Sequence, residues 1–133
     1  MSLPDFLRRP APRRLVTLAC GGYWLFAAAA SHVPAKHVPD LEVSDKVLHG
    51  GGYFVLASLF WLVLAAHRLA RPMRVLLVLS IIPLYGVLDE WTQPLVNRTC
   101  DVWDWVADTV AAVAAVALWE SLTRARRWVF AGR

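Results

Sequence analysis

The chain has 133 residues, of which 58% are hydrophobic and 18% are charged, and its formal net charge is +4. This length suits a single domain over residues 1–133, and the apolar content exceeds the roughly 45–50% of ordinary soluble proteins. The composition disfavours a soluble helical bundle, which would have to expose much of this apolar surface, and favours a membrane protein whose outer surface meets lipid.

Four long apolar blocks follow one another along the chain. A helix needs about 20 mostly apolar residues to cross the hydrocarbon, and the last two blocks reach this length only with acidic residues at one end. The first block lacks a clear cleavage site, so we interpret it as a helix rather than a signal peptide. We therefore expect an all-α, polytopic membrane protein with about four transmembrane helices, at Leu15–Val33, Val47–Ala66, Val75 to about Trp91, and about Val102–Leu122.

Positive charges gather on one side of this arrangement. They lie before the first block, between the second and third, and after the fourth, whereas only Lys36, Lys46 and Arg98 lie opposite. Because Lys and Arg resist translocation, both termini are predicted to be cytoplasmic. Insertion topology and attraction to anionic lipids account for the basic balance, so we expect membrane lipids as partners and no nucleic acid.

The two cysteines are predicted to be unpaired within the chain. Cys20 lies deep in the first helix and Cys100 in an outer loop, and this separation exceeds the reach of a disulfide. The chain has no C-x-x-C pair, which disfavours a cysteine-bound zinc site. We predict no resident metal ion and no cofactor.

The second block opens with the sequence DKVLHGGGYF. Asp45, His49 and Tyr53 follow one another at spacings of four, which places them on one helical face, and Lys46 precedes His49 by three. HGGG occurs in the oxyanion loop of esterases, but the chain has no G-x-S-x-G nucleophile motif, so we reject that interpretation. The glycines 50–52 are expected to permit close helix contact. A capped helix start with an interfacial His and Tyr is the simpler alternative.

Acidic residues mark the end of the third block and the start of the fourth. Glu90 and Gln93 are three apart and are expected to face a polar interior, although Asp89 and Glu90 could instead mark the membrane surface. Three more acids, Asp101, Asp104 and Asp108, have the spacing of one helical face. They could bind a hard cation or pair with Arg98, Lys46 and His49. We favour pairing, because three cationic or ionisable donors are available.

The order D-K-x-x-H-x-x-x-Y, E-x-x-Q and R-x-x-D-x-x-D-x-x-x-D resembles the VanZ-like family of small bacterial membrane proteins. The resemblance covers about Asp45–Ala112, half of the chain, and departs from the family at Asp108, usually Asn, and at Ala112, usually Gly. It implies a helical fold in the bacterial cytoplasmic (inner) membrane. For the family's namesake it also implies an accessory part in antibiotic resistance, to the glycopeptide teicoplanin, without a settled chemical mechanism.

Two main functions compete. The first is an accessory, envelope-stress role, in which a polar pocket at the extracytoplasmic face binds a lipid head group, a cell-envelope precursor or a glycopeptide. Its expected ligand-binding residues are Asp45, Lys46, His49, Tyr53, Glu90, Gln93, Arg98, Asp101, Asp104 and Asp108.

The second is an intramembrane enzyme, a transferase or hydrolase acting on a lipid-linked phosphate or sugar. His49 with Asp45 would act as base and Glu90 as acid. Whether the chain is an enzyme stays open, as does a purely structural role in an assembly.

Overall fold

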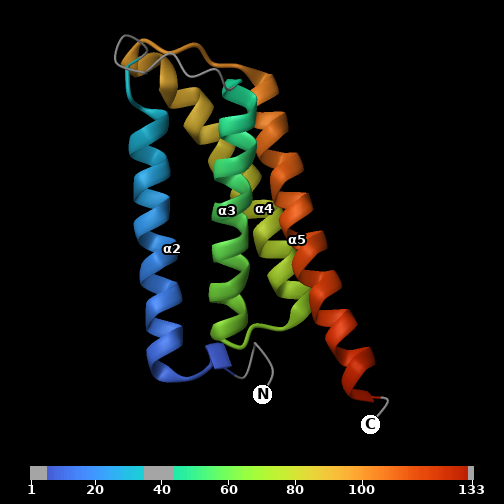
Figure 1. The fold of residues 1–133 in the computed structure, drawn as a ribbon. Helices are drawn as coiled ribbons and strands as arrows, with labels where there is room; N and C mark the ends of the chain where they lie inside the picture. Colours follow the sequence, from blue (N-terminus) through green and yellow to red (C-terminus); the bar gives the residue numbers. More distant parts are fainter. Residues whose placement is uncertain (1–5, 35–43, 132–133) are drawn as a thin grey trace.

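The computed structural model describes residues 6–34 and 44–131, and within these ranges every regular element is helical. Four long helices run up and down as an antiparallel bundle (Figure 1). The prediction of an all-α fold is therefore confirmed. The elements are α2 Pro10–Ser31, α3 Asp45–Ala66, α4 Arg71–Thr92, the short 3-10 helix η2 Gln93–Val96, and α5 Val102–Ala131.

Local sequence explains where these helices start and stop. Proline stands in the first turn of α2, at Pro10, and of α4, at Pro72, where its fixed φ suits a helix and its missing N–H costs nothing. The chain leaves α3 through Arg68, with φ of 64°, and leaves η2 through Asn97, with φ of 60°. Asparagine tolerates this left-handed conformation, which here turns the backbone toward α5.

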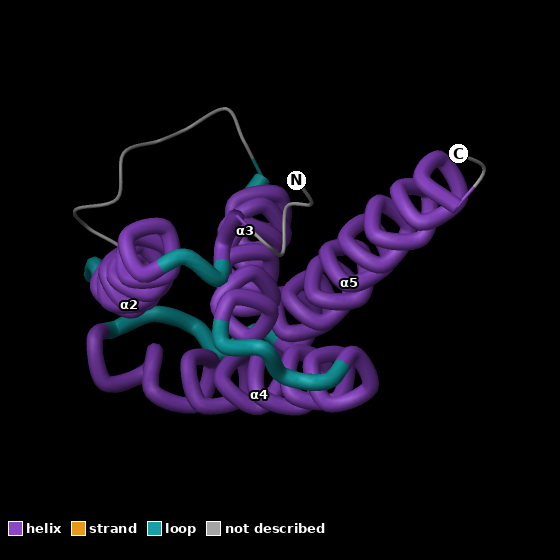
Figure 2. Tube along the Cα trace, turned by 90° about the horizontal axis from the view of Figure 1, so that it is seen from below, coloured by secondary structure: helices purple, strands orange, loops and turns teal. Residues whose placement is uncertain are grey.

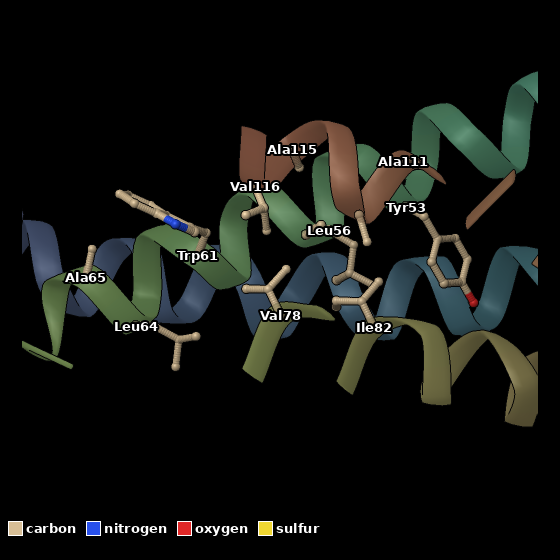
Figure 3. Close-up of a cluster of buried hydrophobic side chains, with 12 residues drawn as sticks. Tyr53, Leu56, Trp61, Leu64, Ala65, Val78, Ile82, Ala111, Ala115 and Val116 are labelled. Carbon is tan, nitrogen blue, oxygen red and sulfur yellow. The ribbon is translucent and has the colours of Figure 1, made fainter. Parts of the chain in front are cut away.

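The hydrophobic core lies between α3, α4 and α5. The most extensive helix contact joins α3 to α5, where Ala112 and Ala115 are fully buried. Small residues let two helix backbones approach closely, so the alanine-rich face of α5 packs directly against α3. Larger side chains, such as Leu56 of α3 and Ile82 of α4, fill the space that the alanines leave (Figure 3).

Helix length and surface chemistry agree with a membrane location. Among the described residues, three segments are long and apolar enough to cross a membrane: Lys46–Ala66, Arg71–Val96 and Val102–Ala125. A 22-residue helix is about 33 Å long, close to the roughly 30 Å of hydrocarbon in a bilayer. Large apolar side chains face outward along the bundle, including Leu76, which is 58% exposed, and Val110, which is 62% exposed.

The first long helix, α2, is not one of these three candidate spans. Its first turns carry Arg13 and Arg14, and it packs mainly against α3. Only Val16 and Cys20 of α2 are buried, while Leu18 and Leu25 lie more than 70% exposed. The expectation of about four transmembrane helices is therefore met for three of the four helices, and α2 is the least buried member of the bundle.

The two ends of the bundle differ in chemistry. One end, here called the basic end, holds the start of α2, the turn between α3 and α4, and the last turns of α5 (Figures 1 and 2). There Arg71 forms an ion pair with Glu120, and the Arg74 guanidinium lies 4.5 Å from the centre of the Trp61 ring. The opposite end, here called the polar end, holds the start of α3, the end of α4 with η2, and the start of α5.

Candidate functional site

Six polar side chains at the polar end are buried, although they belong to helices that are otherwise apolar. Each of them is at most 8% exposed, and they come from α3, α4, η2 and α5. Burial of ionisable groups at membrane depth is costly, so such residues mark functional sites. We call this set the polar cluster: His49, Asp89, Glu90, Gln93, Asp104 and Asp108.

Lys46 connects the polar cluster to the outer surface. Its Nζ donates to Asp101 Oδ2 at 2.8 Å and to Asp104 Oδ1 at 3.2 Å. Asp101 in turn accepts a hydrogen bond from the backbone N–H of Trp103 at 2.8 Å. The Lys46 hydrogen bond, followed by that N–H, holds the pKa of Asp101 below its usual range. Asp101 therefore lies just before α5 and caps its N-terminus, whereas its spacing from Asp104 and Asp108 predicted that it would lie within the helix.

His49 lies at the centre of the cluster. Its Nδ1 is 3.3 Å from Asp108 Oδ1, within hydrogen-bond distance, and 3.9 Å from Glu90 Oε1. Asp108 is completely buried. The expected pairing of the aspartates with cationic donors is thus found for Lys46 and His49. The carboxylate that orients His49 in the described structure is Asp108.

Glu90 faces inward, as its spacing from Gln93 predicted. Gln93 Nε2 donates to Glu90 Oε1 at 3.1 Å, and the backbone N–H of Asp101 donates to Glu90 Oε2 at 2.8 Å. Glu90 and the preceding Asp89 are each only 3% exposed. The alternative that these two acids simply mark the membrane surface is therefore wrong.

Asp89 is the main residue of the cluster that sequence reasoning left out of the site. Ser31 Oγ at the end of α2 donates to Asp89 Oδ1 at 2.7 Å, and His32 Nδ1 lies 3.7 Å from the same oxygen. His32 Nε2 also lies 2.9 Å from Thr92 Oγ1. Asp89 and Glu90 point about 100° apart around α4. Both are buried because α4 meets α2 on one side and α3 with α5 on the other.

Two carboxylate oxygens in the cluster are left over. Within the described part of the chain, Asp89 Oδ2 and Asp108 Oδ2 are buried and have no hydrogen-bond partner. Tyr53, another predicted site residue, stacks on His49 at 6.2 Å between ring centres and on Tyr85 at 5.8 Å. The Tyr53 hydroxyl is also buried without a hydrogen-bond partner and lies close to the Asp89 carboxylate. Because a buried polar atom without a partner costs free energy, the two oxygens would be satisfied by a small movement of this hydroxyl or by a donor or cation of a ligand.

One glycine permits the close helix approach at this site. A Cβ added to Gly86 of α4 would lie 3.1 Å from Asp108 Oδ2 and 3.2 Å from Trp105 Cδ1, which is tighter than ordinary contact. At glycines 50–52 an added Cβ would meet no described atom closer than 3.7 Å. The HGGG glycines are therefore in ordinary contact at most, with an added Cβ at Gly50 4.0 Å from the backbone oxygen of Ala107, and the tightest approach is at Gly86.

Two further predicted site residues lie at the polar end, one at the start of α3 and one after η2. Asp45 begins α3, but its side chain lies outside the described structure, so its predicted partnership with His49 is not described. Arg98 follows Asn97 in the turn after η2 and is half-buried at the polar end, where its backbone N–H donates to the Gln93 carbonyl at 3.2 Å. The two cysteines are free, as predicted, with Cys20 buried and Cys100 exposed.

The cluster also contains a set of groups that could hold a metal ion. One ligand atom from each of His49, Asp89 and Glu90 lies within 4.8 Å of the others, and all three residues are buried. No metal was predicted from the sequence, because the aspartates of the last helix were expected to pair with cationic side chains and the cysteine spacing disfavours a zinc site. Chemically, the cluster can accept hydrogen bonds from hydroxyl or ammonium groups, or ligate a cation.

Comparison with known proteins does not extend this description. No protein-family model, no curated protein and no solved structure matches the chain. The similarity to the VanZ-like family therefore remains a resemblance in motif order. The chain is a small helical protein with three candidate membrane spans and a buried cluster of His, Asp and Glu side chains.

Proposed function

We propose that the chain is a VanZ-like integral membrane protein of the bacterial inner membrane, and that its polar cluster binds a ligand of the cell envelope. The ligand classes are a lipid head group, a cell-envelope precursor and a glycopeptide, and the role is accessory to envelope stress or antibiotic resistance. The observation that carries this proposal is the burial of six polar side chains at one end of a bundle that exposes many large apolar side chains.

The distribution of charge supports an extracytoplasmic site. Arg68, Arg71 and Arg74 stand at the basic end, which also holds the start of α2 and the end of α5. By the positive-inside rule, this end and both termini belong in the cytoplasm, and the polar end belongs outside. A ligand from the outer leaflet or the cell wall would then meet the exposed Lys46–Asp101 pair first and the buried acids behind it.

The balance of charges indicates which ligand groups fit best. Four carboxylates of the cluster are buried, and Lys46 already donates to Asp101 and Asp104. Hydroxyl or ammonium donors would satisfy the leftover oxygens of Asp89 and Asp108, whereas a phosphate would have to displace an existing ion pair. Amino sugars and amine-bearing lipid head groups are therefore favoured over ligands recognised through phosphate alone.

Binding to the purified full chain in lipid nanodiscs tests this function. The probes are teicoplanin, a lipid-linked N-acetylated amino sugar and phosphatidylethanolamine, each titrated against the wild type and Glu90→Gln. Glu120→Gln is the matched control, because Glu120 is also a buried acid but lies at the basic end. We expect the Glu90 variant to bind one of these probes at least about tenfold more weakly, since a lost charge-assisted hydrogen bond is worth about 1.5–3 kcal/mol. Equal affinities in all three proteins, or no binding of any probe, would count against the proposal.

One observation also favours an enzyme as the second candidate. The His49 ring touches one carboxylate, Asp108, and has a second, Glu90, at 3.9 Å, which is the arrangement of a general base next to an acid. The reaction class would be transfer or hydrolysis of a lipid-linked phosphate or sugar. Turnover of such substrates that disappears in both His49→Ala and Glu90→Gln, but persists in Glu120→Gln, would establish it. Absence of turnover in wild-type protein that still binds ligand would leave the accessory role.

A further inference from the structure

We propose that the polar cluster binds one divalent transition-metal ion through His49, Asp89 and Glu90. The inference deepens the proposed function, since it uses the same site and rests on that site being a binding site. The three residues come from two helices, His49 from α3 and the other two from the last turn of α4. All three are more than nine-tenths buried, so an ion among them would be shielded from solvent.

The distances suit a common ion. Metal–nitrogen and metal–oxygen bonds to such ions are about 2.0–2.2 Å, so two donor atoms on one ion lie at most about 4.3 Å apart. His49 Nδ1 and Glu90 Oε1 are 3.9 Å apart, inside this limit. The full set of three donor atoms lies within 4.8 Å. Because 4.8 Å slightly exceeds this limit, the three side chains would have to draw closer together to ligate one ion.

An independent feature points to a bound cation. Asp89 Oδ2, on one of the three proposed ligands, is buried and without a hydrogen-bond partner among the described residues. The same holds for Asp108 Oδ2, which belongs to the residue next to His49. A dication would satisfy the first oxygen directly and would compensate the buried negative charge of both carboxylates.

The remaining contacts of the cluster would hold the ligands in place. Gln93 and the backbone N–H of Asp101 hold Glu90, and Ser31 holds the other oxygen of Asp89. Outer contacts of this kind orient metal ligands and raise affinity. Asp108 Oδ1 contacts the same His49 Nδ1 that would ligate the ion, so this contact would give way to the metal bond. One imidazole with two carboxylates suits zinc or manganese better than calcium or magnesium, which prefer oxygen ligands alone.

Metal binding is tested on the full-length protein in detergent, after EDTA treatment and with no organic ligand present. The probe is Zn²⁺, measured by equilibrium dialysis with elemental analysis and by the shift of the unfolding temperature. We expect one ion per chain in the wild type and in His67→Ala. The latter removes an exposed histidine at the basic end, whose side chain is hydrogen-bonded to Thr17. The affinity should fall about a hundredfold or more in His49→Ala, Asp89→Asn and Glu90→Gln, because loss of an outer contact alone costs about 10–100-fold.

X-ray absorption at the zinc edge keeps the test independent of how the variants fold. Nitrogen and oxygen ligands without sulfur are expected, since neither cysteine belongs to the proposed ligand set. The proposal would be overturned by sulfur ligands or by less than one ion per wild-type chain. It would also be overturned if the His49 variant bound Zn²⁺ as tightly as His67→Ala does, or if equimolar Ca²⁺ displaced Zn²⁺. Absence of Zn²⁺ binding, together with envelope-ligand binding that persists in EDTA, would overturn the metal alone and leave the proposed function standing.

Discussion

Replacement of Ala115 by leucine should separate the α3–α5 contact from the lipid-facing surface. Ala115 is completely buried and belongs to the same core cluster as Leu56 and Trp61 (Figure 3), whereas the adjacent Ala114 is exposed. The two substitutions add the same side chain, one residue apart, on the same helix. Only the first requires α5 to move away from α3.

The magnitude follows from the packing. Extra methylene groups in a well-packed core cost about 1–3 kcal/mol. In a membrane little of this cost is recovered by burial, because lipid is as apolar as leucine. We expect Ala115→Leu to lower the free energy of unfolding by about 2–3 kcal/mol, which is about a 30- to 150-fold shift toward the unfolded state. Ala114→Leu should change the unfolding free energy by no more than about 0.5 kcal/mol.

Reversible unfolding in mixed micelles, followed by tryptophan fluorescence, measures both free energies. Ala115 lies two turns of α5 below Asp108, so the same variant should also weaken ligand binding at the polar end by displacing Asp108 from His49. Equal stabilities of the Ala114 and Ala115 variants would refute the packing of α5 on α3. Lower stability with unchanged binding would refute only the connection between that packing and the site.

Three further outcomes are expected. Because its pKa is lowered in the folded state, Asp101 contributes stability that is present above the unfolded pKa, about 3.9, and is lost as pH falls through the lower folded value. Asp101→Asn should therefore unfold at a lower temperature than the wild type at pH 6, and the two melting temperatures should converge near pH 2; a constant difference would contradict this. An impermeant maleimide on intact cells should label Cys100, which is exposed at the polar end, but not the buried Cys20, and labelling only after lysis would reverse the proposed orientation. Arg71→Met should destabilise the protein by about 1–3 kcal/mol in the same unfolding measurement, because it leaves the buried Glu120 carboxylate without its partner. Addition of Glu120→Gln should recover part of that loss, and failure to do so would show that the ion pair is not responsible.

Sequence periodicity was sufficient for the helices and for much of the polar cluster. The apolar blocks located α3, α4 and α5, and the spacings of His49, Glu90 and Asp108 placed each on the inner face of its helix. These features depend on the helical repeat alone, which a single sequence displays directly.

Features that depend on how helices meet could not be read in the same way. The burial of Asp89 results from the contact between the end of α2 and the last turn of α4, which no spacing within α4 records. The neighbours of Gly86, Asp108 and Trp105 on another helix, likewise follow from how α4 meets α5. The three glycines of HGGG were expected to permit close contact, yet a run of glycines does not indicate which of them faces a neighbour.

Asp101 makes the length of the loop before α5 a requirement of the fold. Its backbone N–H is bonded to Glu90 of α4, its carboxylate is bonded to Lys46 of α3, and the same carboxylate caps α5. One inserted or deleted residue between Asn97 and Asp101 would break all three attachments together, whereas a changed side chain in between would break none of them. Proteins that share this site should therefore keep the length of that loop fixed.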